Sequence, residues 1–93
     1  MPTENFGDFE WDSEKRTFNL EKHQIDFCNA VVMFHGTLKP VRRMITELGE
    51  KRIVSIGKMD GLLFIIVYTM RDHKIRIISV RRANRDEYHY YTE

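Results

Sequence analysis

The stretch "KRIVSIGKMDGLLFIIVYTMRDHKIRIISVRR", residues 51–82, has the strongest secondary-structure pattern in the sequence. β-Branched and aromatic residues fill three segments of it, residues 51–58, 62–70 and 74–82, which is typical of strands. Asp60-Gly61 and Asp72-His73 separate the segments, and a two-residue Asp-Gly loop is typical of a tight β-hairpin. The middle segment is apolar on both faces, as expected of a central strand. The stretch therefore predicts a three-stranded antiparallel meander.

Two-residue turns also fix which residues of the meander face each other. They pair Arg52 with Thr69 and Thr69 with Arg76. One sheet face then carries Phe64, Ile66 and Tyr68 and is expected to pack on helices, and Arg81 falls on that same face. The opposite face is aliphatic in its middle. One end of this opposite face is polar and collects Glu50, Arg52, Thr69, Arg71, Lys74 and Arg76.

The flanking segments predict helices. Asp12 follows a short strand over residues 9–11 and is a suitable N-cap for a helix that runs to about His23. Asp26 caps a second helix, whose apolar residues recur at helical spacing. Asn84, with Glu87 three residues later, resembles a capping box and predicts a C-terminal helix.

These elements predict an α+β fold. Its mainly antiparallel sheet combines the meander with the short N-terminal strand, a two-helix hairpin packs on one face, and a C-terminal helix follows. Residues 37–49 are the least readable part of the sequence and could form a strand or an irregular connection. The length of 93 residues predicts a single domain spanning residues 1–93.

Composition narrows the class of protein. Hydrophobic residues make up 42% and charged residues 31%, which is ordinary for a globular domain. The single cysteine, Cys28, excludes an internal disulfide and a cysteine-based zinc site. The four histidines lack metal-ligand spacing. No targeting segment or membrane span is apparent, so we expect a cytoplasmic protein without metal, cofactor or membrane contact.

The net charge of +1 hides a strongly basic stretch. Residues 71–85 carry six cationic side chains and one acid, and arginine outnumbers lysine there. A guanidinium group matches phosphate oxygens, which favours an anionic ligand such as nucleic acid. The alternative is a solvated basic surface.

Glu50 and His23 each allow two interpretations. Glu50 lies opposite Arg71 in the predicted register, so it could form a cross-strand ion pair or act as a carboxylate among phosphate-binding arginines. Neighbouring guanidinium groups lower a carboxyl pKa and weaken it as a base. His23 could be a catalytic group or a cation that suits the end of a helix.

Three segments together resemble the BrnT family of toxins. They are "FEWDSEKRTFNLEKHQIDF" (residues 9–27), "GEKRIVSIG" (residues 49–57) and "VYTMRDHKIRIISVRRA" (residues 67–83), followed by Glu87 and Tyr91. Only residues 35–48 fall outside the resemblance. It implies a RelE-like fold and a ribonuclease toxin that a protein antitoxin of the BrnA type neutralises. It also implies that the toxin contacts promoter DNA only indirectly, through the antitoxin complex.

The resemblance and the basic face together predict a metal-independent endoribonuclease. The RNA 2′-hydroxyl would attack the adjacent phosphate, arginines would stabilise the added charge, and Glu50 would orient an arginine or accept a proton. A non-catalytic module that binds RNA or a partner through the same patch is the alternative. The candidate catalytic residues are Glu50, Arg52, Arg71, Arg76, Arg81, His23 and Tyr91, and the candidate RNA-binding residues are Lys58, Lys74 and Arg82.

Overall fold

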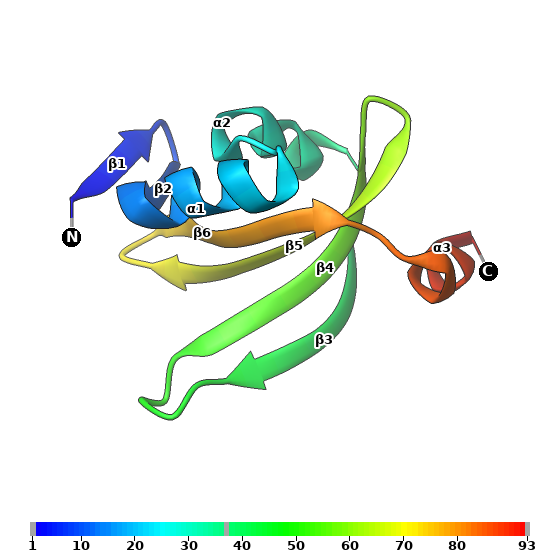
Figure 1. Cartoon of the computed structure of the whole chain (residues 1–93). Coiled ribbons are helices and arrows are strands. Elements are labelled where there is room, and N and C mark those ends of the chain that lie inside the picture. Colours follow the sequence, from blue (N-terminus) through cyan, green and yellow to red (C-terminus); the bar gives the residue numbers. More distant parts are fainter. Residues whose placement is uncertain (1, 37, 93) are drawn as a thin grey trace.

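The computed structural model describes residues 2–36 and 38–92, which form a six-stranded sheet with helices around it (Figure 1). The strand order is β1-β2-β6-β5-β4-β3. Neighbouring strands are antiparallel except β2 and β6, which are parallel, so the expected mainly antiparallel α+β fold is confirmed. The elements are β1 (Thr3–Phe6), β2 (Phe9–Asp12), α1 (Ser13–His23), α2 (Phe27–Ala30), the 3-10 helix η1 (Val31–His35), β3 (Lys39–Ile45), β4 (Lys51–Met59), β5 (Leu62–Arg71), β6 (Lys74–Arg82) and α3 (Arg85–Thr92).

The meander of β4, β5 and β6 forms as predicted. Both of its turns are left-handed, with φ of 54° and 77° at Asp60 and Gly61 and of 49° and 67° at Asp72 and His73. Two successive positive φ angles match the right-handed twist of the flanking strands. The expected register between β4 and β5 is confirmed, since Ile53 faces Tyr68.

A β-bulge at Ile78 shifts the register of β6. Tyr68 faces Ile77, yet the preceding residue of β5, Val67, faces Ser79. The extra residue moves the following side chains to the opposite face. Arg81 consequently lies opposite Ile65 rather than Phe64. The predicted placement of Arg81 on the helix-covered face is therefore wrong.

The sheet has two edge strands: β1 was not predicted, whereas a strand was one of two alternatives for the segment that contains β3. β1 pairs with β2, and β3 pairs with β4. β3 reads poorly as a strand because it contains Pro40 and two adjacent arginines. Proline is tolerated at a sheet edge, where its missing N–H costs no ladder hydrogen bond.

The second helical segment covers one sheet face, as expected, but it is mostly not α-helical. A single α-helical turn, α2, continues as η1, and together they bury Phe27, Ala30, Val31 and Met33. These side chains pack with Phe64 and Ile66, on the face that we call the helix face. Figure 1 shows α2 stacked over the strands.

The expected two-helix hairpin on one sheet face is not strictly formed, because α1 does not pack through an apolar stripe. Asp12 caps α1 as predicted, because its side chain accepts from the backbone N–H groups of Glu14 and Lys15. However, Asn19 is its only buried residue, while Phe18 and Leu20 are exposed. α1 thus docks through a polar contact rather than an apolar stripe.

Asn19 ties α1 to the edge of β6. β2 pairs with β6 only at the start of that strand, so the later residues of β6 have no strand neighbour on this side. Asn19 takes the place of the missing strand neighbour. Its Oδ1 accepts from the backbone N–H of Val80, and its Nδ2 donates to the carbonyl of Ile25, both at 3.0 Å. The amide satisfies two buried backbone groups and fixes the rotation of α1.

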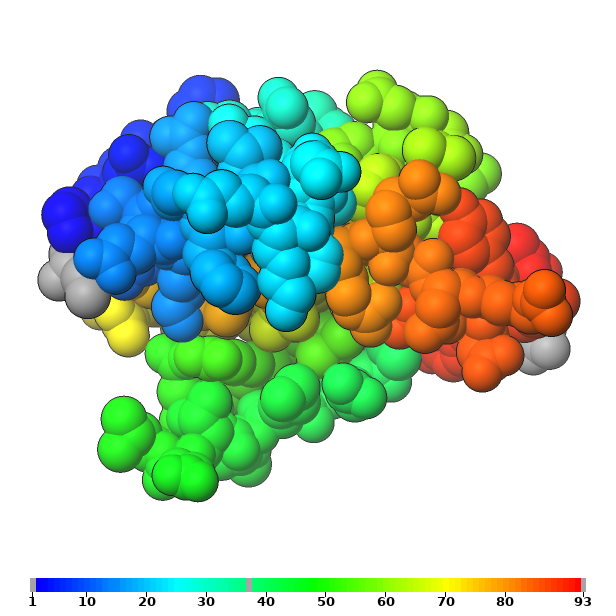
Figure 2. Space-filling model, in the orientation of Figure 1, coloured from blue at the N-terminus to red at the C-terminus, as the bar shows by residue number. Residues whose placement is uncertain are grey.

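The face opposite the helix face carries Arg52, Arg71, Arg76 and Arg81, and we call it the arginine face. Only one end of it is covered, because Tyr88 and Tyr91 of α3 pack there on a second apolar cluster. α3 starts with the predicted capping box, in which Asn84 and Glu87 exchange hydrogen bonds of 2.8 and 2.9 Å. The β3–β4 end of the sheet stands out below α1 (Figure 2).

Candidate active site

Three of the predicted site residues meet at the uncovered end of the arginine face. Arg52 Nε donates to Glu50 Oε1 at 2.8 Å, and Arg71 Nη2 donates to Glu50 Oε2 at 3.4 Å. One carboxylate thus holds two guanidinium groups from two neighbouring strands. Arg71 keeps 52% of its side chain exposed, so its remaining donors stay accessible to a ligand.

A closed loop positions Glu50 before β4. The backbone N–H of Glu50 donates to Thr46 Oγ1 at 3.1 Å, and the Thr46 N–H donates to the Glu50 carbonyl at 2.9 Å. Gly49 closes the loop with φ of 86°, a conformation that glycine adopts without strain. The loop holds the carboxylate in the lining of a cleft that β3, β4 and β5 also line.

The Glu50 carboxyl is held in its charged form. Its hydrogen bond to Arg52 is the largest cause of a lowered pKa, and the charges of Arg52, Arg71 and Lys15 add to it. A carboxylate with a lowered pKa is a weak base, and at neutral pH it has no proton to donate. Its contacts therefore suit the orientation of arginines better than proton transfer.

Arg76 lies beside this cluster but has its own partner. It faces Thr69 in the register, and its Nη1 donates to Glu10 of β2 at 2.8 Å. Arg76 and Glu10 are each only 12% exposed. The Arg76 guanidinium is consequently less accessible to a ligand than that of Arg71.

Arg81 belongs to a separate group at the α3 end. It forms a two-pronged ion pair with Glu87, with both distances 2.8 Å, and this contact raises the pKa of Arg81 and lowers that of Glu87. Arg81 faces Ile65, which lies four residues along β5 from Thr69. That separation is about 13 Å along a strand, so Arg81 does not join the Glu50 cluster. Tyr91 packs on the apolar cluster beneath α3.

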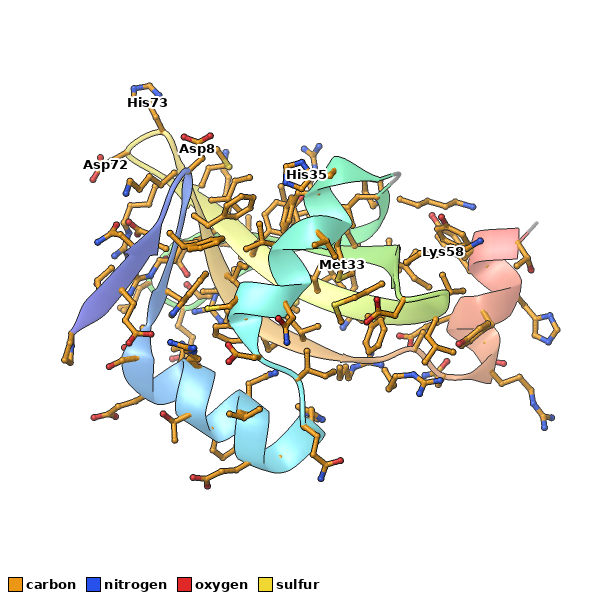
Figure 3. The ribbon with its side chains drawn as sticks, turned by 90° about the horizontal axis from the view of Figure 1, so that it is seen from above. Asp8, Met33, His35, Lys58, Asp72 and His73 are labelled. Atoms are coloured by element: carbon orange, nitrogen blue, oxygen red, sulfur yellow. The ribbon has the colours of Figure 1, made fainter. Side chains whose placement is uncertain are left out.

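The predicted RNA-binding residues are dispersed. Lys74 Nζ donates to Asn5 Oδ1 at 2.7 Å, beside the Glu50 end of the arginine face. Arg82 lies on the helix face, with its guanidinium 5.5 Å from the centre of the Phe64 ring. Lys58 is exposed beside α3, at the opposite end of the molecule from the β5–β6 turn (Figure 3).

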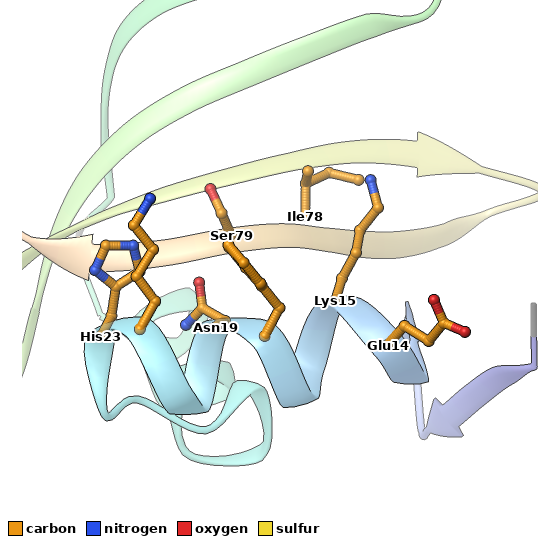
Figure 4. A pocket seen from close by; sticks show the side chains of 8 residues that line it. Glu14, Lys15, Asn19, His23, Ile78 and Ser79 are labelled. Carbon is orange, nitrogen blue, oxygen red and sulfur yellow. The ribbon is translucent and has the colours of Figure 1, made fainter.

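His23 lies on α1, in a groove against β6 that Lys15, Ile78 and Ser79 also line (Figure 4). Lys15 was missing from the predicted site although it reaches far enough to affect Glu50. Its spacing of four residues from Asn19 and eight from His23 would have revealed it, because these positions share one side of a helix. Glu10 was also missed, since its contact with Arg76 joins strands far apart in sequence.

Two kinds of site are absent from the described residues. Within residues 2–36 and 38–92, no three His, Cys, Asp or Glu side chains gather in a way that could hold a metal ion. In the same part of the chain, no helix is long and apolar enough to cross a membrane.

The uncovered arginines can bind and neutralise a phosphate, since guanidinium groups pair with its oxygens. A comparison with protein-family models agrees with this chemistry. The model of the ribonuclease toxin BrnT of type II toxin–antitoxin systems matches residues 11–87, which include every predicted site residue except Tyr91. A search of curated proteins finds no match. The chain therefore belongs to the BrnT family of ribonuclease toxins of type II toxin–antitoxin systems.

Proposed function

We propose that this toxin is a metal-independent endoribonuclease whose centre is the cluster of Glu50, Arg52 and Arg71. The single observation that carries the proposal is the pair of guanidinium groups held on one carboxylate at an uncovered cleft. A phosphate that enters the cleft meets cations whose positions are already fixed. Preorganised charge of this kind stabilises a transition state without reorganisation during the reaction.

The proposed reaction is an internal transfer at phosphorus. The 2′-oxygen of one nucleotide loses its proton and attacks the adjacent phosphate, and a five-coordinate phosphorus with added negative charge forms. The bond from phosphorus to the 5′-oxygen then breaks, and this oxygen takes a proton. A 2′,3′-cyclic phosphate and a 5′-hydroxyl remain. Arg52 and Arg71 stabilise the added charge, and Glu50 orients both guanidinium groups.

The other predicted residues take supporting roles in this proposal. Arg76, paired with Glu10, adds positive charge behind the phosphate rather than a direct contact. Arg81 and Lys74 lie at opposite ends of the arginine face and would bind neighbouring phosphates of the strand. Tyr91 supports α3 and, through it, the Glu87 carboxylate that holds Arg81.

Lys58 and Arg82 support RNA binding less well. Lys58 lies beside α3, and Arg82 lies on the helix face, so both are remote from the Glu50 cluster. We keep them as sites of weak, long-range attraction for RNA.

Type II toxins act with a protein antitoxin, and we propose that a BrnA-type antitoxin brings carboxylates to Arg52 and Arg71. An antitoxin that covered these arginines with apolar side chains would leave buried charges unpaired, whereas carboxylates pair with them. Opposite charges also speed association at low salt. Replacing Arg71 with alanine should therefore slow antitoxin association and weaken its salt dependence, as stopped-flow fluorescence would measure. An unchanged rate and salt dependence would place neutralisation on another surface.

Substrates with a single 2′-deoxynucleotide test the chemistry directly. The toxin should cleave an RNA oligonucleotide at a defined bond and leave the same bond intact when the nucleotide on its 5′ side lacks the 2′-hydroxyl. Cleavage of the deoxy-substituted bond would exclude 2′-oxygen attack. RNA binding without cleavage of either oligonucleotide would instead favour a non-catalytic binding module.

A further inference from the structure

A groove between α1 and β6 has no role in the proposed chemistry. Figure 4 shows Lys15 and His23 reaching from α1 toward Ile78 and Ser79 of β6. Phe18 and Lys22 complete its α1 wall. Ile78 is the bulge residue of β6, so the bulge that moves Arg81 also forms the floor of this groove.

The positions of the groove side chains are fixed by a buried anchor. Asn19 is 2% exposed, and its two hydrogen bonds set the rotation of α1 against β6. Lys15 and His23 lie one turn on either side of Asn19, and Lys22 lies three residues after it. Residues at such spacings share one side of a helix. Their alignment along β6 is therefore a consequence of the anchor.

Lysines stand at both ends of the groove. Lys15 lies near its start, and Lys22 and His23 lie at its end. Eight residues of α-helix separate Lys15 from His23, a distance of about 12 Å. A stacked nucleic-acid strand advances about 3.4 Å per nucleotide, so the groove spans on the order of three nucleotides. Glu14, the acid of the groove lining, lies at its N-terminal end beyond Lys15.

One residue of the groove, Lys15, also acts on the Glu50 cluster through its charge. The charge of Lys15 contributes to the lowered pKa of Glu50, although the two residues come from α1 and from the loop before β4. Lys15 therefore adds positive charge both to the groove and to the surroundings of Glu50.

An exposed aromatic ring stands beside the cations. Phe18 is 62% exposed, and Lys22 Nζ lies 5.6 Å from the centre of its ring. Single-strand binders combine a cationic track for the backbone with aromatic rings on which bases stack. A base stacks in this way only when it is unpaired, so the ring favours single-stranded RNA over a duplex.

We propose that the groove of Lys15, Phe18, Lys22 and His23 binds the single-stranded RNA that flanks the cleaved bond. Lys15 and Lys22 contact phosphates, and Phe18 stacks on a base. The proposal rests on the proposed endoribonuclease function and adds to it the form of the substrate and the path that it takes. If α1 presented only an exposed surface with solvated lysines, replacing Lys15, Lys22 or Phe18 would not change RNA binding.

Binding of a non-cleavable oligonucleotide tests the groove without relying on catalysis. We would measure the fluorescence anisotropy of a labelled single-stranded 2′-O-methyl RNA over a range of salt concentrations. Lys15→Ala and Lys22→Ala should each weaken binding. Each should also reduce the slope of log Kobs against log salt by about 0.7, the value for one phosphate of a single strand. Arg85→Ala, an exposed cation on α3, is the charge-matched control and should leave the slope unchanged.

Phe18→Leu tests stacking separately, because leucine keeps an apolar side chain without the ring. It should weaken binding about 5-fold or more, with an unchanged salt slope. Phe6→Leu is the matched control, since Phe6 is 51% exposed on β1, outside the groove. Kinetics on a long oligonucleotide should show a raised KM for Lys22→Ala.

Groove variants that bind the oligonucleotide as their controls do would overturn the proposal. Normal RNA binding combined with a loss of antitoxin binding would also overturn it and would make the groove a protein interface. A wild-type protein that fails to cleave RNA would contradict the proposed function alone. The binding differences would still decide the role of the groove.

Discussion

Arg71 and Arg76 lie on adjacent strands of the same sheet face, yet the same substitution should have different effects at the two positions. Arg71→Ala should mainly lower activity, and Arg76→Ala should mainly lower stability. Arg71 is half exposed and meets Glu50 at 3.4 Å. A pair of this kind contributes about 0–1 kcal/mol to stability. Arg71→Ala should therefore leave the melting temperature almost unchanged. It should lower kcat by about 100- to 1,000-fold, the usual cost of removing one donor that stabilises developing charge.

Arg76→Ala should mainly destabilise the fold. Arg76 and Glu10 are each 12% exposed and are joined at 2.8 Å, so the substitution strands a nearly buried carboxylate. The expected cost is about 3–5 kcal/mol. In a domain of this size each kcal/mol lowers Tm by about 4–8 °C, so a decrease of at least about 12 °C is expected. Removing the stranded charge as well, with Glu10→Gln, should recover part of the loss.

Two assays on the same preparations separate these effects. Thermal melts followed by circular dichroism give stability, and initial rates of RNA cleavage at a temperature where every variant is folded give kcat. Arg85→Ala controls for the loss of one exposed cation. Cleavage of RNA by Arg71→Ala at the wild-type rate, or melting of Arg76→Ala at the wild-type temperature, would contradict these roles of the two arginines.

Three further substitutions test the structure at other points. Glu50→Gln keeps the shape of the side chain but weakens the hold on both arginines, so kcat should fall by up to about 100-fold while circular dichroism shows an unchanged fold. Arg81 lowers the pKa of Glu87 below its ordinary value of 4.5, so this pair stabilises the folded state above that pH and loses its effect as the pH falls through the lowered pKa. Glu87→Gln should accordingly be less stable than wild type at neutral pH, and urea titrations should show the difference shrinking below about pH 4.5. An alanine Cβ at position 57 would lie 2.7 Å from Leu38 Cδ2, so Gly57→Ala should lower stability in the same titrations by about 1–3 kcal/mol, toward the lower value if Leu38 can rotate away.

The meander was predictable because its local signals agree with one another. Asp60-Gly61 favours the left-handed turn that forms, and the aliphatic run of β5 suits only the centre of the sheet. The grouping of Glu50, Arg52 and Arg71 on one face followed from strand alternation and turn length alone. Agreement of this kind between local preference and global fold makes a segment readable from sequence.

The features of the fold and the site that were not predicted depend on contacts between distant parts of the chain. The bulge at Ile78 has no turn residue to mark it, so the face of Arg81 could not be predicted. The structural role of Asn19 could not be predicted, because it comes from the backbone N–H of Val80, sixty-one positions away. Glu10 became part of the site only through the parallel pairing of β2 with β6.

RNA cleavage in the presence of excess chelator, with the ends of the products identified by mass spectrometry, tests the central claim most directly. We expect undiminished cleavage by the antitoxin-free toxin and products that carry a 2′,3′-cyclic phosphate, or the 3′-phosphate derived from it, beside a 5′-hydroxyl. Complete loss of cleavage in chelator, or products with a 5′-phosphate, would contradict it.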